Sequence, residues 1–211
     1  MQKPELSPET VRAMIDLGVF AFAFGLTNRV TRHPDGETLE SDSDHTVMLG
    51  LAACAFAQRF APHLDIGKIA QFALVHDLVE VYAGDAVTSH TQFTEADHKT
   101  KDEREAAALT RIRSEFDAEL PWLGETIEAY ERRDTPEARF VKVVDKAMPK
   151  IANILNKGVT FKPQGHDKES ARAFLENQRA KLSSSYGSDQ PEALALLEAL
   201  GEEMMREIFP G

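Results

Sequence analysis

Cysteine is almost missing from this chain of 211 residues, because Cys54 is the only one. No disulfide can therefore form within the chain, which is typical of proteins that work in the reducing cytoplasm. Cys54 lies in an apolar pattern with helical spacing, so we interpret it as a core thiol rather than a reactive one. We expect a cytoplasmic protein.

Basic residues are also scarce. Lysine and arginine number 24 against 35 aspartates and glutamates, which gives a net charge of −11. A surface that binds nucleic acid needs a basic face, so we expect no nucleic-acid partner. A small anionic ligand is not excluded, because a metal or a few local arginines can reverse the potential inside one pocket.

Long apolar runs are missing as well. The most apolar window is VFAFAF at residues 19–24, far shorter than the roughly 20 residues that cross a membrane. The first ten residues, MQKPELSPET, are polar and lack the apolar segment of a secretion signal. We expect no membrane partner.

The chain shows neither paired strand patterns nor an internal repeat. Its 42% hydrophobic and 28% charged residues are those of an ordinary globular protein, and no shift in composition marks a boundary. We therefore predict one all-α domain over residues 1–211, built as a helical bundle, with residues 28–43 as a polar loop.

Apolar spacing and capping residues predict where the helices lie. Asp44 is the expected cap of the second helix and Asp65 that of the third, which should run unbroken until Gly84 stops it. The expected helices cover about 8–26, 45–60, 66–83, 95–118, a short segment from Pro121, 136–155, 169–184 and 190–208.

The third of these segments contains the sequence LVHDLVEVYAGD, residues 74–85. Its apolar residues indicate a buried helix, yet His76, Asp77 and Glu80 interrupt it. Burying ionisable groups is costly unless they are paired or bind a metal. At roughly 100° per residue, Glu80 should project between His76 and Asp77, one turn further along.

Two other helices carry similar interruptions. Asp44 and His45 open the second helix, and Asp145 interrupts the apolar run FVKVVDKAM. Each has a plain alternative: a helix cap for Asp44, a surface ion pair with Lys146 for Asp145, and a hydrogen-bonded core residue for a lone histidine. Together, two histidines and two aspartates from three helices favour a divalent-metal site, and such open sites without sulfur are more often catalytic than structural.

This order of residues resembles the HD-domain metal-dependent phosphohydrolase superfamily, and within it the branch of 5′-deoxynucleotidase-like enzymes. The matching segments are ESDSDHTVML, ALVHDLVEVYAGD and TPEARFVKVVDKAM, with further similarity in REAAALTRI and ETIEAYERRDTPEA. The resemblance covers about residues 15–157. It implies a bundle of helices around one divalent ion, so the helices at about 169–208 should pack on that core.

The resemblance also implies roles for individual residues. The metal ligands would be His45, His76, Asp77 and Asp145. Glu80 would activate or orient the attacking water, and Asp85 would assist near the leaving group. The ion could be Mn, Co, Zn, Ni, Fe or Mg.

Arg29 would be the phosphate clamp in this family, since a guanidinium group suits phosphate oxygens. Arg32 is the second candidate for that role. The residue after the clamp is often aromatic in the deoxynucleotidase branch, whereas here it is Val30. The preference between deoxyribose and ribose therefore stays open.

Lysines follow one helical stripe through the last block, at Lys142, Lys146 and Lys150. We expect Lys146 or Lys150 to touch phosphate; the alternative is a solvated face. His90 and His98 could reach a second metal, but solvent-facing positions are the plainer reading.

The leading hypothesis is a phosphatase of nucleoside 5′-monophosphates. The alternatives are a hydrolase of larger nucleotides, either deoxynucleoside triphosphates or an alarmone, and a non-catalytic nucleotide-binding module. Glu80 and Asp85 argue against the module, because neither is needed to hold the ion. The resemblance makes a homodimer the expected assembly, and the last helices would either form that interface or cap the core.

Overall fold

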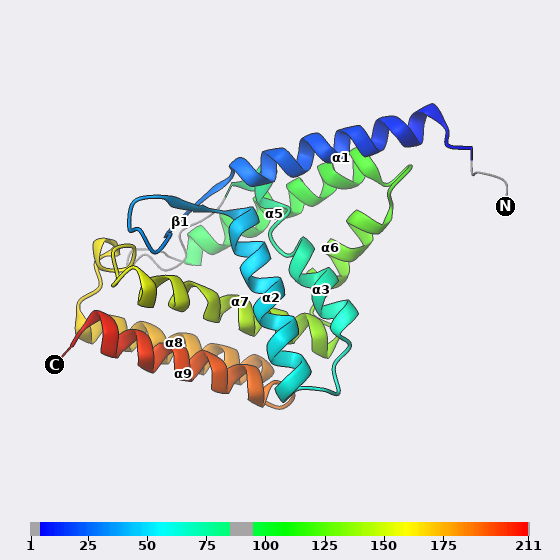
Figure 1. Ribbon diagram of the computed structural model, residues 1–211. Coiled ribbons are helices and arrows are strands. Elements are labelled where there is room, and N and C mark those ends of the chain that lie inside the picture. The colour runs from blue at the N-terminus through cyan, green and yellow to red at the C-terminus, as the bar shows by residue number, and fades with distance from the viewer. Residues whose placement is uncertain (1–4, 85–94, 211) are drawn as a thin grey trace.

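The computed structural model describes residues 5–84 and 95–210, and most of them are helical (Figure 1). The prediction of an all-α fold is confirmed. The helices are α1 (Pro8–Leu26), α2 (Asp42–Phe60), α3 (Ile66–Val75), α4 (Glu80–Ala83), α5 (Glu95–Phe116), α6 (Trp122–Arg132), α7 (Pro136–Leu155), α8 (Lys168–Tyr186) and α9 (Pro191–Ile208), with a short 3-10 helix at Lys162–Gln164.

Helix starts follow the local capping chemistry. The Ser7 hydroxyl accepts a hydrogen bond from the Thr10 amide at 3.0 Å. The Thr135 hydroxyl accepts one from Ala138 at 3.2 Å, and the Asp65 carboxylate caps α3 in the same way. Because α1 and α7 also have proline at a first-turn position, where its missing N–H costs nothing, both begin where the sequence predicts.

The prediction for the start of α2 was wrong by three residues. Ser41, not Asp44, is the N-cap, and the two side chains form a capping box in which Asp44 accepts from the Ser41 amide at 3.0 Å. A serine followed three residues later by an acidic side chain satisfies two backbone donors at once. His45 therefore lies about one turn inside the helix.

The prediction of a polar loop without strands at 28–43 was also wrong. Strands β1 (Asn28–Arg32) and β2 (Leu39–Ser41) pair antiparallel, with Asn28 opposite Ser41 and Arg32 opposite Leu39. The turn is closed by Asp35, whose carboxylate accepts from two amides, and by Gly36 at a φ of 75°. The hairpin is short and polar, so its alternation is too weak to recognise as strand.

The third predicted helix is broken in its middle. α3 ends at Val75, and residues 76–79 form turns before α4 begins at Glu80. The hydrogen bonds here are of the tighter i→i−3 kind, as from Glu80 N to Asp77 O at 2.9 Å. Side chains three residues apart lie over one another in such turns, which brings Asp77 and Glu80 onto one side. The regular-helix geometry expected for this segment does not hold.

Helix α7 lies at the centre of the core. It packs against α2, α3, α6 and α9, and its side chains Phe140, Val141, Val144 and Met148 are almost completely buried. α8 and α9 lie together along one side of α7 (Figure 1). They add a smaller apolar cluster that includes Phe161, Met204 and Ile208. None of the helices formed by residues 5–84 and 95–210 combines the length and the apolar character needed to span a membrane.

Candidate metal centre

His76 lies in the turn after α3, and one of its two ring nitrogens is already used in a hydrogen bond. Its Nδ1 lies 2.8 Å from the backbone oxygen of Ala73, which can only accept, so Nδ1 carries the proton. The lone pair of Nε2 then faces Asp77 Oδ2 at 2.9 Å. This Nε2 is buried and has no hydrogen-bond partner among the described residues. Two acceptors so close together are stable only with a proton or a cation between them.

His45 and Asp145 approach the same point from α2 and α7. His45 is fully buried, and its Nε2 lies 3.0 Å from Asp145 Oδ1. Its other nitrogen, Nδ1, lies 3.8 Å from Glu40 Oε1. A carboxylate behind a histidine orients the ring of metal-binding histidines in many proteins. Glu40 therefore supports His45 from the hairpin side.

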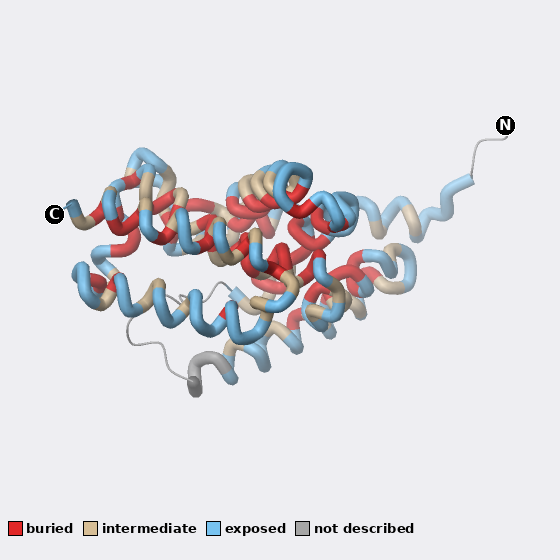
Figure 2. The backbone as a smooth tube through the Cα atoms, turned by 90° about the horizontal axis from the view of Figure 1, so that it is seen from below, coloured by how far each residue is buried: buried red, intermediate tan, exposed pale blue. Residues whose placement is uncertain are grey.

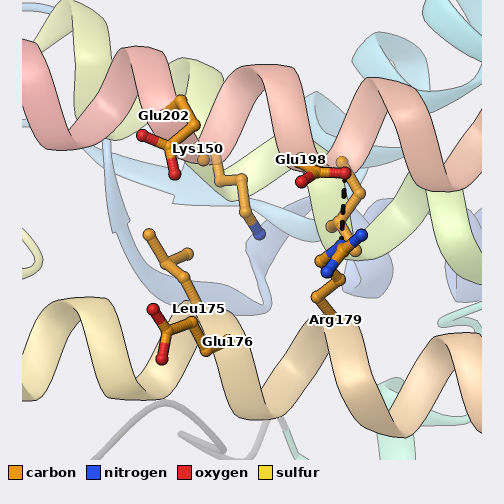
Figure 3. Close-up of a pocket in the computed structure, with 8 residues that line it drawn as sticks. Lys150, Leu175, Glu176, Arg179, Glu198 and Glu202 are labelled. Atoms are coloured by element: carbon orange, nitrogen blue, oxygen red, sulfur yellow. Dashed lines mark ion pairs between the residues drawn. The ribbon is translucent and has the colours of Figure 1, made fainter.

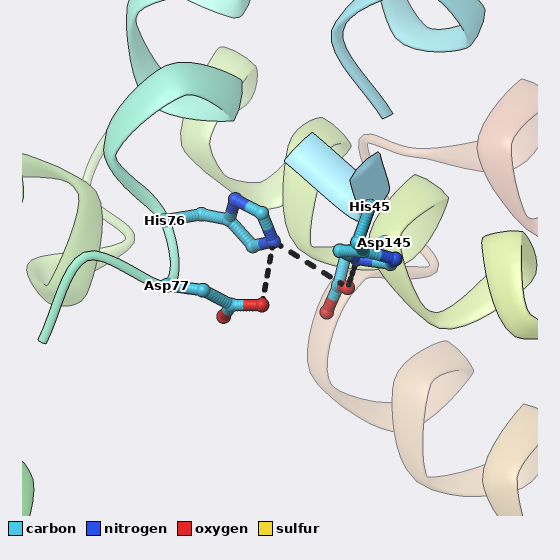
Figure 4. Close-up of side chains that lie close together, drawn as sticks. All are labelled: His45, His76, Asp77 and Asp145. Atoms are coloured by element: carbon cyan, nitrogen blue, oxygen red, sulfur yellow. Dashed lines mark hydrogen bonds and ion pairs between the residues drawn. The ribbon is translucent and has the colours of Figure 1, made fainter. Parts of the chain in front are cut away.

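The four predicted ligands come together. His45, His76, Asp77 and Asp145 each offer one nitrogen or oxygen, and these atoms all lie within 4.8 Å of one another (Figure 4). Two imidazole nitrogens and two carboxylate oxygens suit intermediate divalent ions such as Mn, Fe, Co, Ni or Zn. The donor set, the convergence and the unsatisfied Nε2 of His76 all fit such an ion.

The electrostatics keep the carboxylates in the form that binds metal. Burial alone would raise the pKa of Asp145, but Lys146 Nζ at 3.0 Å and the hydrogen bond from His45 hold that pKa well below its ordinary value. Burial disfavours a charged His45, yet its hydrogen bond to Asp145 and the nearby carboxylate of Glu40 raise its pKa to about 9. A bound divalent ion would replace the proton of His45, because metals and protons compete for the same lone pair.

Arg29 joins this cluster to a second acidic group. Its Nη1 lies 2.7 Å from Asp77 Oδ2 and 3.1 Å from Asp42 Oδ1. Glu80 Oε2 lies 3.8 Å from the same nitrogen. The predicted clamp residue and the predicted catalytic carboxylate are thus both beside the metal cluster, and Arg29 offsets the negative charge that surrounds it.

Sequence reasoning missed the cation on the other side of Glu80. Lys101 of α5 brings its Nζ to 3.7 Å from Glu80 Oε1 and also pairs with Glu105. The spacing of Lys101 and Glu105 is typical of a solvated helix face, so no local pattern points it inward. The role of Asp42 was also missed, although the capping box at Ser41 and Asp44 places Asp42 in the first turn of α2.

Two predicted phosphate contacts lie elsewhere. The Arg32 guanidinium donates to the backbone oxygen of Glu37 in the hairpin turn. Lys150 is buried, and its Nζ donates to Lys146 O at 2.8 Å and to Gln178 Oε1 at 2.6 Å. The structure brings neither side chain to the metal cluster. Of the lysines in the stripe, Lys146 contacts the metal cluster directly, through Asp145.

Lys150 instead lines a pocket between α7, α8 and α9 (Figure 3). The other charged groups of the pocket are Arg179, which pairs with Glu198 at 3.2 Å, and the rim carboxylates Glu176 and Glu202. Burial lowers the pKa of Lys150 to about 7. No ligand of the metal cluster lines this pocket, so the two features are separate.

Three predicted residues cannot be placed. Asp85 and His90 lie outside the described residues, and so does the side chain of His98, although its backbone belongs to α5. Their proposed roles stay predictions.

The fold and the cluster together define a class: a helical protein whose separate helices hold a mixed histidine–aspartate site for a divalent ion. The HD domain family model matches residues 26–185. The match covers most of the chain, which therefore belongs to the HD domain family. The resemblance drawn from the sequence is confirmed.

Similar proteins carry more specific descriptions. The chain is 28% identical over 180 residues to 5′-deoxynucleotidase HDDC2 of Danio rerio, covering 82% of this chain and 78% of that protein. The HDDC2 protein of Bos taurus is 29% identical over 107 residues, covering 51% and 49%. A solved structure described as a predicted metal-dependent phosphohydrolase, from Magnetospirillum magnetotacticum MS-1, matches with a TM-score of 0.74 and 25% identity, covering 94% of this chain and 96% of that one.

Proposed function

We propose that this metal-dependent phosphohydrolase of the HD type hydrolyses the phosphomonoester of nucleoside 5′-monophosphates. One observation carries the proposal: a buried cluster of two histidines and two aspartates lies directly beside Arg29 and Glu80, which form an ion pair. His45, His76, Asp77 and Asp145 would hold the ion. When bound, a divalent ion supplies a Lewis acid for the phosphoryl group and for the attacking water.

Glu80 is the proposed proton acceptor for that water. Its carboxylate has Arg29 3.8 Å from one oxygen and Lys101 3.7 Å from the other, and these two cations hold it beside the ligands, within reach of a water on the ion. Because Asp77 and Glu80 share one side of the turn, the base lies next to the ion's ligands. Asp85, which lies outside the described residues, is proposed to assist at the leaving oxygen.

Arg29 is the proposed phosphate clamp. Its guanidinium group now satisfies the carboxylates of Asp77 and Asp42. A phosphoryl group above the cluster would offer oxygens to the same N–H groups, with charge-assisted bonds that strengthen as charge develops. Lys101 is proposed to bind a second phosphoryl oxygen and to position Glu80.

The distribution of cations supports a substrate with a single phosphate. Arg29, Lys101 and Lys146 contact the cluster or Glu80, whereas Arg32 and Lys150 are engaged elsewhere. A triphosphate or alarmone pocket should need more converging cations than these, so we rank those larger nucleotides second. The names of the similar HDDC2 proteins support a nucleoside monophosphate as well.

The extent of the domain is also part of the proposal. Residues 1–211 are taken as one HD domain, since α9 packs directly on the central helix α7. The non-catalytic binding module ranks last, because Arg29 and Glu80 are both in position beside the cluster.

The test is phosphate release from metal-stripped protein with Mn, Co, Ni, Zn or Mg added back. The panel holds ribo- and deoxyribonucleoside mono- and triphosphates. Inorganic phosphate from monophosphates, only when metal is present, is the expected result. Pyrophosphate or triphosphate release would move the chain to the larger nucleotides, and no release with metal bound would favour the binding module.

A further inference from the structure

Tyr130, in the last turn of α6, packs directly against one of the metal ligands. Its ring lies edge-on to the His76 ring, with 6.3 Å between the ring centroids and 89° between the planes. Phe72 contacts the same ring at 6.0 Å, and the Arg133 guanidinium lies over it at 3.5 Å from its centroid. Tyr130 is only 1% exposed, and the buried segments of the chain gather in the middle of the molecule (Figure 2). The phenol is therefore part of the core that surrounds the metal cluster.

The hydroxyl group of Tyr130 is not explained by this packing. Its oxygen is buried and has no hydrogen-bond partner among the described residues. A buried tyrosine usually finds a partner for its O–H, because a buried polar group without one is destabilising. Phenylalanine would fill the same space without this penalty. A hydroxyl kept here indicates a partner that the described part of the chain does not supply.

The hydroxyl lies within the electrostatic reach of the metal ligands. Burial raises the pKa of Tyr130 well above its ordinary value, and Arg133 opposes this shift. The carboxylates of Asp145 and Asp77, two of the four predicted ligands, add to it. A phenol is protonated near neutral pH even without any shift, since its ordinary pKa is about 10. The group beside the cluster is therefore an O–H donor, and the partner that it needs is an acceptor.

Cations near this phenol favour an acceptor that carries negative charge. Lys146 Nζ lies 3.0 Å from Asp145 Oδ2, and Lys142 stands one helical turn before Lys146 on α7. The charge of Lys146, together with burial, lowers the pKa of Lys142 to about 8. Arg133, which lies over the Tyr130 ring, acts on Lys142 in the same direction. Like charges gathered in this way are stabilised by an anion, and phosphoryl oxygens are anionic.

We propose that the Tyr130 hydroxyl donates a hydrogen bond to an oxygen of the phosphoryl group bound at the metal cluster. This role rests on the proposed function, which brings a phosphoryl group to that place. Arg29 holds the group from the hairpin and Lys101 holds it from α5, while Tyr130 holds it from α6. Because Tyr130 is a neutral donor, it binds an anionic oxygen without forming an ion pair with the ligand carboxylates.

Phosphate binding tests the hydrogen bond. Tyr130→Phe removes one oxygen atom and keeps the ring, so the contacts with His76 and Phe72 stay. The probe is inorganic phosphate, and calorimetry measures its affinity for the full chain loaded with whichever of Mn, Co, Ni or Zn it binds most tightly. The variant should bind phosphate about 10–100-fold more weakly, the range for a hydrogen bond to a charged group. Its metal content should equal that of the wild type, because no donor atom of the cluster has changed.

A melting experiment separates this role from a purely structural one. The metal-free protein is heated without phosphate and followed by circular dichroism. If the hydroxyl serves the phosphoryl group, Tyr130→Phe deletes a buried polar group that destabilises the free protein. The melting temperature should then rise by about 2 °C or more. A hydroxyl that supported the fold would give a lower melting temperature in the same variant.

The matched control is Tyr186→Phe, which deletes the same atom at the end of α8. Its phosphate affinity should equal that of the wild type. Equal phosphate affinities of Tyr130→Phe and Tyr186→Phe would overturn the proposal. A loss of metal or a lower melting temperature in Tyr130→Phe would overturn it as well.

The result for Tyr130 can be told apart from the result for the proposed function. Weaker phosphate binding by Tyr130→Phe supports the role of Tyr130 even if the wild type releases no phosphate from nucleoside monophosphates. That lack of release would contradict the proposed substrate alone. A metal-loaded wild type that binds no inorganic phosphate would overturn the role of Tyr130, whatever its activity.

Discussion

The metal cluster and the pocket around Lys150 both bury ionisable side chains, but the groups that surround these side chains differ. In the cluster, opposite charges alternate, and Lys146 and His45 keep the pKa of Asp145 low against the effect of burial. In the pocket, Lys150 donates to two neutral oxygens, and burial lowers its pKa to about 7. Burial alone therefore does not mark a functional site. The convergence of several lone pairs on one point does.

Breaking the cluster should have the largest effect. His76→Ala or Asp77→Ala removes one of four donors, and metal content and phosphate release should fall together. The loss should exceed the 10–100-fold that is typical for residues supporting a ligand from behind. Metal analysis and a phosphate assay on the same sample check this. A variant that keeps both metal and rate would remove the residue from the ligand set.

Glu80→Gln should separate binding from catalysis. The ligands stay intact, so metal content should match the wild type, while kcat should fall by about 10²–10⁴, the range for a general acid or base. Glu103→Gln on α5 is a control for a glutamate away from the cluster. Unchanged kcat in Glu80→Gln would end its assignment as the proton acceptor.

Lys101→Met should have an intermediate effect. Losing a cation beside Glu80 should raise KM for the monophosphate and lower kcat, for a combined loss of about 10–100-fold, as charge-assisted contacts are worth about 1.5–3 kcal/mol. Lys101→Arg should restore part of the lost activity. Lys99→Met, at an exposed position on the same helix, is the control. Equal kinetics for Lys101→Met and Lys99→Met would show that Lys101 neither binds the phosphate nor positions Glu80.

Lys150→Met should have the smallest effect on activity, within about twofold, because Lys150 is separate from the cluster. It should change the pH dependence of stability instead. The pKa falls from 10.5 to about 7 on folding, so between these values the unfolded chain binds more protons and stability rises with pH.

The variant should lose this rise, on the order of a few kcal/mol at about 1.4 kcal/mol per pKa unit. Urea unfolding of both proteins at pH 7 and pH 9 measures the difference. Parallel pH dependence in wild type and Lys150→Met would show that burial does not shift this lysine.

Much of this site can be predicted from the sequence. Helix starts follow from local caps, as at Ser7 and Thr135, and polar interruptions of apolar helices identified His45, His76, Asp77 and Asp145. These signals are local, because they depend on residues within one turn of each other.

The remaining features depend on tertiary packing. No glycine or proline ends α3 at Val75, and Leu78 suits a helix. Lys101 and Lys150 look alike in sequence, yet α5 turns one toward Glu80 and α8 accepts a hydrogen bond from the other. The direction of a long side chain is set by its neighbours, and those neighbours are distant in the chain.

One titration tests the central claim most directly. Metal-free protein receives a divalent ion stepwise, and bound metal and phosphate release from a nucleoside monophosphate are measured on each sample. Activity should rise in proportion to bound metal and level off at one ion per chain, and Asp145→Ala should show neither. Activity without metal, or full metal binding by Asp145→Ala, would contradict the account.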